Sequence, residues 1–96
     1  MKAINVETLG ANKTLTVKDA PIQRLDPAGA RDVTLPNVIN KGASFEICNF
    51  ADAAETITVK DSEASTVETV DQNEAVTFIS DGTDWQHTGV RTLALT

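Results

Sequence analysis

Residues 77–85 read Thr-Phe-Ile-Ser-Asp-Gly-Thr-Asp-Trp, and this stretch decides the fold class. It predicts a strand, a tight turn at Asp81-Gly82 and a short return strand that carries the only tryptophan. Glycine suits such a turn because, without a Cβ, it accepts the positive φ that a hairpin requires. Phe78 and Trp85 supply large apolar side chains on either side of the turn. We therefore expect these two residues to anchor the core.

The rest of the chain repeats a β pattern. Pairs of apolar residues separated by one residue recur between polar positions, which is typical of strands with one buried face. Turn formers such as Asp26-Pro27 and Asp71-Gln72-Asn73 separate these pairs. Thr, Val and Ile together make up 28 of the 96 residues, and their stiffness at χ1 favours strands. We expect strands near residues 3–7, 13–18, 21–25, 31–35, 44–49, 55–60, 66–70, 74–80, 84–87 and 90–95. The fold class that follows is all-β, a small antiparallel β-sandwich or barrel with extended, strand-like termini.

A chain of this length holds one domain. We divide it into an N-terminal arm (1–12), a β-module (13–87) and a C-terminal strand or tail (88–96). The apolar residues of the two terminal segments are more than one small core can hold. Extra apolar strands at chain ends are typical of subunits that pair with another molecule. The expected interface residues are Ile4, Val6, Leu9, Val90, Leu93 and Leu95.

Charge is unevenly distributed along the chain. Residues 1–50 hold five acidic and six basic side chains, whereas residues 51–96 hold nine acidic and only two basic ones. An acidic surface repels phosphate, so we expect binding neither to nucleic acid nor to anionic membranes. Either the acidic side chains simply keep the surface soluble, or they form a docking face for a basic partner.

The sequence contains little that suggests chemistry. Cys48 is the only cysteine and His87 the only histidine, so neither a disulfide nor a zinc site is expected. No motif surrounds Cys48 or Ser80 that would make either a nucleophile. Residues 1–10 have one lysine and no apolar run, which argues against a signal peptide. We predict a protein that is not an enzyme, with no catalytic residues, cofactor or metal, although the scattered acids leave open weak calcium binding.

The order of several short motifs resembles a recurrent β-module of tailed-bacteriophage virions. A Val-Thr-Leu-Pro strand (33–36) is followed by Gly-x-x-Phe-x-Ile-x-Asn (42–49) and by Asp-Gly-Thr-x-Trp (81–85). The module occurs in small head decoration (cement) proteins and in pieces of tail fibres, and the resemblance covers roughly residues 13–87. It identifies no binding residues.

The resemblance implies a virion structural protein on the capsid exterior, present in the host cytoplasm during assembly. Its partner would be the major capsid protein, and decoration proteins of this kind are commonly homotrimers that clamp neighbouring capsid subunits. The alternative is a receptor- or glycan-binding domain of a tail fibre or adhesin. A chain of 96 residues suits the first role better, because fibres are usually longer.

Overall fold

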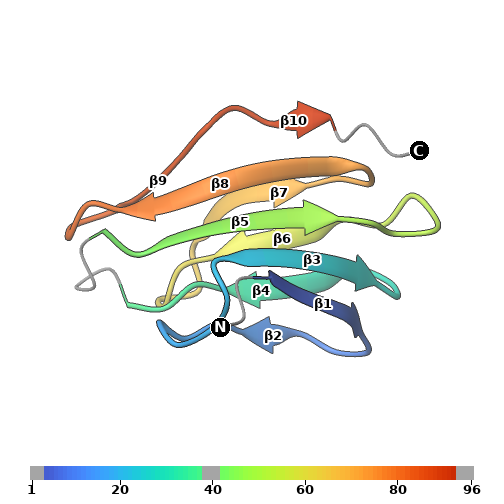
Figure 1. Ribbon diagram of the computed structural model, residues 1–96, viewed down its shortest axis with the longest axis horizontal. Helices are drawn as coiled ribbons and strands as arrows, with labels where there is room; N and C mark the ends of the chain where they lie inside the picture. Colours follow the sequence, from blue (N-terminus) through green and yellow to red (C-terminus); the bar gives the residue numbers. More distant parts are fainter. Residues whose placement is uncertain (1–3, 38–41, 93–96) are drawn as a thin grey trace.

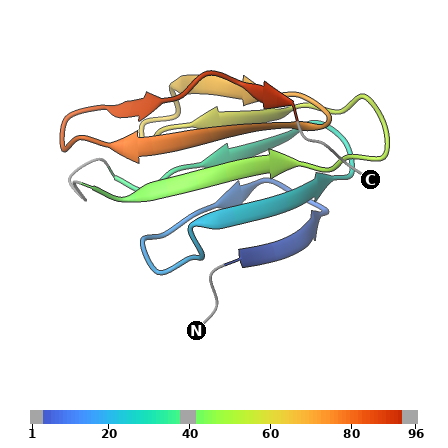
Figure 2. The same cartoon turned by 45° about the horizontal axis from the view of Figure 1, so that its top comes forward.

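The computed structural model describes residues 4–37 and 42–92, which form two β-sheets packed face to face (Figures 1 and 2). No helix occurs among these described residues. The predicted all-β, two-layered architecture is therefore confirmed. Neither sheet closes on itself, so the fold is a sandwich and the barrel alternative is wrong.

Sheet A contains six strands. β1 (Ile4–Leu9), β3 (Ile22–Pro27), β5 (Ser44–Asn49), β8 (Glu74–Ser80) and β10 (Arg91–Thr92) follow one another in space, and β9 (Trp85–His87) also pairs with β8. Sheet B contains four strands in the order β2 (Lys13–Thr14), β4 (Arg31–Thr34), β6 (Ile57–Lys60) and β7 (Thr66–Val70). The outermost strands are β1 and β10 in sheet A, and β2 and β7 in sheet B.

The first two-thirds of the chain winds as a coil between the two sheets. β1, β3 and β5 are parallel neighbours in sheet A, and β2, β4 and β6 are parallel neighbours in sheet B. Antiparallel pairs occur only where β7, β8, β9 and β10 join. The expected fully antiparallel sandwich is thus wrong. A period of two shows which face of a strand is buried but not which way the strand runs.

The core lies between the sheets. Buried positions alternate with more exposed ones along β6, as the apolar pair Ile57 and Val59 predicts, and along β3, where the buried positions include the polar Gln23. Phe78 is fully buried and Trp85 is 7% exposed, so both expected anchors lie in the core. The Trp85 ring centroid lies 6.2 Å from that of Phe45, and its indole N–H donates to the carbonyl of Pro36 at 3.0 Å. The buried core cluster comprises Leu9, Leu15, Leu25, Val33, Leu35, Phe45, Ile47, Ile57, Val59, Val70, Val76, Phe78 and Trp85.

One buried amide ties the two sheets together. Asn49, at the end of β5, is fully buried. Its side-chain nitrogen donates to the carbonyls of Glu55 and of Val70 in sheet B, both at 2.9 Å, and its Oδ1 accepts the N–H of Ala51 at 2.9 Å. Without these bonds the buried side-chain amide of Asn49 would be left unsatisfied in the interior. This explains the asparagine that ends the Gly-x-x-Phe-x-Ile-x-Asn motif.

The N-terminal strand is part of sheet A. β1 pairs with β3 over all six of its residues, from Ile4 opposite Ile22 to Leu9 opposite Pro27. The expectation of an arm separate from the β-module is therefore wrong for residues 4–9. Leu9 is only 2% exposed and belongs to the core, so its assignment to the interface is also wrong. The cause is strand alternation, which turns Leu9 inward with Asn5 and Glu7.

Candidate functional site

Two exposed apolar side chains of sheet A lie on its outermost strand, β1, and a third, Ile79 of β8, is 44% exposed. Val6 is 76% exposed and Ile4 is 42% exposed, and both point away from the core. Within residues 4–37 and 42–92, β1 is paired on one side only, with β3, and its other side is an open sheet edge. We call this open side of residues 4–9 the β1 edge. An open edge offers unpaired backbone groups to another chain.

Polar side chains of β1, β2 and β3 bond to one another on the core-facing side of β1, next to the β1 edge. Asn5 donates to Gln23 at 2.8 Å and to Glu7 at 3.0 Å, and Glu7 pairs with Lys13 of β2 at 3.0 Å. The hydrogen bond from Asn5, and then the interactions with Lys13, lower the pKa of Glu7 below its usual value. The Glu7 charge is thus compensated where the two sheets end.

A hollow of about 470 Å³ lies beside the β1 edge, on the outer face of sheet A. It is lined by Val6, Glu7 and Thr8 of β1, Arg24 and Asp26 of β3, and Phe50. The Arg24 guanidinium lies over the Phe50 ring, 4.1 Å from its centroid. The hollow therefore combines the apolar side chains of Val6 and Phe50 with the carboxylates of Glu7 and Asp26 and a cation that lies over an aromatic ring.

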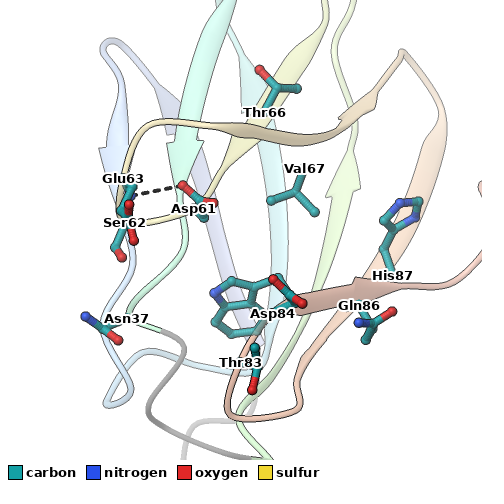
Figure 3. A pocket seen from close by; sticks show the side chains of 11 residues that line it. Asn37, Asp61, Ser62, Glu63, Thr66, Val67, Thr83, Asp84, Gln86 and His87 are labelled. Atoms are coloured by element: carbon teal, nitrogen blue, oxygen red, sulfur yellow. Dashed lines mark hydrogen bonds between the residues drawn. The ribbon is translucent and has the colours of Figure 1, made fainter.

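A second hollow, of about 500 Å³, opens between β7 and β9 (Figure 3). Figure 3 shows Asp61 and Glu63 on one side, Val67 of β7 across the opening and His87 of β9 on the other side. Asp84 and Trp85 also line it. The carboxylates give it an acidic rim, the feature that suggested a docking face for a basic partner.

The acidic side chains near this second hollow mainly organise their own loops. Asp61 accepts the N–H groups of Glu63 and Ser65, each at 2.9 Å. Asp81, in the predicted Asp-Gly turn, accepts those of Asp84 at 2.7 Å and Thr83 at 2.8 Å, which lowers the Asp81 pKa. Gly82 has a φ of +94°, as the turn prediction required. Within residues 4–37 and 42–92, no three His, Cys, Asp or Glu side chains are grouped to hold a metal ion.

Cys48 and His87, the only cysteine and the only histidine of the chain, lie on different strands of sheet A. Cys48 lies on β5 and is 5% exposed, and burial raises its pKa against the opposing charge of Arg24. A thiol held protonated in this way is a poor nucleophile. His87 is exposed on β9, where its Nδ1 lies 3.8 Å from a Glu68 oxygen. Cys48 lies opposite Ala75 in the pairing of β5 with β8, whereas Ser80, at the other end of β8, lies opposite Trp85 of β9.

The structure separates the predicted interface residues into two groups. Ile4 and Val6 lie on β1, whereas Val90, which is 45% exposed, immediately precedes β10 at the opposite edge of sheet A (Figure 1). Leu93 and Leu95 lie outside the described residues. Sequence reasoning missed the hollow beside β1, since parallel pairing is what brings Thr8, Asp26 and Phe50 to one place.

Charge is also divided between the two ends of the sandwich. Residues 4–37 carry four acidic and four basic side chains, whereas residues 61–92 carry seven acidic ones against Arg91. Arg91 pairs with Glu46 of β5. The end that includes β1 is thus neutral, and the end that includes β7 and β9 is strongly acidic.

Comparison with known proteins gave no match to a family model, to a curated protein or to a solved structure. None of the described segments forms a helix long and apolar enough to cross a membrane.

Proposed function

We propose that the protein is a virion structural protein that decorates and stabilises the assembled capsid of a tailed bacteriophage. The observation that supports this best is the β1 edge, an open strand of six residues that exposes Val6 and Ile4 beside a hollow. A strand of the major capsid protein would add to this edge, with backbone hydrogen bonds for attachment and alternating side chains for register.

Bridging needs a second contact, and sheet A offers one at its far side. Val90 is exposed next to β10, across the sheet from β1. Two contacts on opposite edges let one molecule touch two neighbouring capsid subunits. In the proposed assembly the protein is a homotrimer on the capsid exterior, where several linked contacts bind far more tightly than one.

The alternative is a receptor- or glycan-binding domain of a tail fibre or adhesin. Its ligand would occupy the hollow between β7 and β9, which is lined by polar side chains including Asn37 and Gln86. Sugars stack on exposed aromatic rings, but Trp85 is only 7% exposed and its N–H is engaged by Pro36. We therefore favour the capsid role.

Cosedimentation with capsids tests the proposal. Capsids assembled from the major capsid protein of the same virus, without this protein, should bind wild-type chain. Val6→Asp places a charge on the β1 edge and should weaken binding, whereas the control Val17→Asp changes another exposed valine, 52% accessible, in the turn after β2. Absence of wild-type binding, or equal loss in both variants, would contradict the proposal. Electron microscopy of decorated capsids would show whether three copies meet.

A further inference from the structure

The hydrogen-bonding direction of each β1 residue follows from its pairing with β3. The N–H of Ala28 donates to the carbonyl of Leu9 at 3.2 Å, in a register that sets Leu9 opposite Pro27. Backbone groups alternate in direction along a strand, so the odd-numbered residues of β1 face β3. Ile4, Val6 and Thr8 therefore direct their N–H and C=O groups to the open side.

These three residues form a self-complementary pattern. In an antiparallel pair, two residues whose groups face each other exchange both hydrogen bonds. If Val6 lies opposite Val6 of a second copy, then Ile4 lies opposite Thr8 in both directions, and all outward groups pair in about six hydrogen bonds. A shift of one residue would place residues whose backbone groups face β3 opposite residues whose backbone groups face the open side, and these hydrogen bonds would not form.

Charge selects the same register. With Val6 at the centre, the carboxylate of Glu7, on the core-facing side of β1, lies opposite the neutral side chain of Asn5 of the second copy. A shift of two residues toward the C-terminus would set Glu7 against Glu7, which is unfavourable for like charges on paired strands. A shift of two the other way would pair only Ile4 with Val6 among the outward-facing residues of β1, and Thr8 would lie opposite a position that precedes β1.

The side chains of the outer face fit this pairing. Val6, at 76% exposure, meets its own copy at the two-fold axis. Ile4 of the second copy lies opposite Thr8, which lines the hollow of about 470 Å³ together with Val6, Arg24 and Phe50. The pairing thus brings an exposed isoleucine beside a hollow to which Val6 and Phe50 contribute apolar surface, twice by symmetry.

The charge distribution favours a second copy at this end of the molecule. Residues 4–37 are electrically balanced, so two such ends approach without net repulsion, whereas the acidic ends that carry β7 and β9 would repel each other. We propose that the free protein forms a two-fold symmetric dimer in which the β1 edges of two copies pair antiparallel, centred on Val6. This concerns the protein before it meets any partner. If the β1 edge also binds the capsid, as proposed above, the dimer must open first.

Disulfide trapping tests the register. Paired residues of this hydrogen-bonded type have Cα atoms about 5.5 Å apart, within the range of about 4.4–6.8 Å that a disulfide spans. In a Cys48→Ala background, Val6→Cys should oxidise readily to a species of twice the 10.2 kDa chain mass. Mixing Ile4→Cys with Thr8→Cys should give the crosslinked heterodimer. The control Val17→Cys is also exposed but lies off β1, and it should crosslink much more slowly.

Light scattering tests the dimer without a crosslink. Wild-type protein should have twice the chain mass and dissociate on dilution. Val6→Lys should have the mass of one chain with an unchanged circular dichroism spectrum, and Val17→Lys should remain dimeric. A wild-type mass of one or three chains, or Val6→Cys crosslinking no faster than the control, would overturn the inference. Capsid cosedimentation is read separately, so a failed dimer and a failed capsid role give different results.

Discussion

Replacing Trp85 by alanine tests whether the C-terminal hairpin anchors the core. The side chain is 7% exposed, packs its ring 6.2 Å from that of Phe45 and donates to Pro36 at 3.0 Å. Removing a buried tryptophan costs about 3–5 kcal/mol of unfolding free energy. Roughly 1 kcal/mol of this belongs to the hydrogen bond and about 0.5–1.5 kcal/mol to the aromatic pair. The loss is a large part of the ~5–15 kcal/mol that stabilises a typical domain.

Urea and thermal unfolding followed by circular dichroism measure this loss. In a domain of this size each kcal/mol lowers the Tm by about 4–8 °C, so Trp85→Ala should melt at least ~12 °C below wild type. Trp85→Phe keeps an aromatic ring near Phe45 but loses the N–H, and it should fall between the two. Gln86→Ala, on the exposed neighbour in β9, is the control and should change stability by less than about 0.5 kcal/mol. If Trp85→Ala melts within a few degrees of wild type, the anchoring argument is refuted, and Trp85 becomes a candidate ligand contact.

Two further predictions concern polar groups between and below the sheets. Asn49→Ala leaves the carbonyls of Glu55 and Val70 without their side-chain donor. Because an orphaned group costs about 1–3 kcal/mol, the variant should lose roughly 2–4 kcal/mol of unfolding free energy, measured in urea. A loss below about 0.5 kcal/mol would contradict a sheet-linking role. For Glu7 the folded-state pKa is lowered, by Asn5 first and by Lys13 next, so its stabilisation is present above the unfolded pKa and is lost as the pH falls through the folded one. In Glu7→Gln the unfolding free energy should therefore fall less steeply at acid pH than in wild type. The difference should be less than about 1 kcal/mol, because the ion pair is partly exposed. An unchanged fall at acid pH would show that Glu7 does not contribute.

Local sequence signals were sufficient for the strands and the hairpin. Most strands lie within or close to the expected ranges, although β2 covers only Lys13–Thr14 of the expected 13–18 and the pair Ile4 and Val6 faces outward. Asp81-Gly82 forms the expected turn, because the positive φ of Gly82 is available to few other residues. Burial of Phe78 and Trp85 follows from their size. These features depend only on neighbouring residues.

Strand direction and partner choice were not available from the same signals. The short segments after Leu9 and after Pro27 lead to the opposite sheet, so β1, β3 and β5 run parallel instead of forming hairpins. Parallel pairing alone places Thr8 beside Asp26 and Phe50 near Leu25, and thereby creates the hollow beside β1. Pro36 as the acceptor for the Trp85 indole, 49 residues away in sequence, could not be foreseen from either residue.

By itself, then, the sequence determined the all-β class, the strand positions, the hairpin turn, the two core anchors and the acidic bias of the C-terminal half. The tertiary structure decided that Leu9 belongs to the core, that residues 4–9 are a sheet strand and not an arm, and that Ile4 and Val6 lie at the opposite edge of sheet A from Val90. The physical reason is that alternation and turn chemistry act over a few residues, whereas the edge of a sheet is defined by which distant strand pairs on one side and which side is left open.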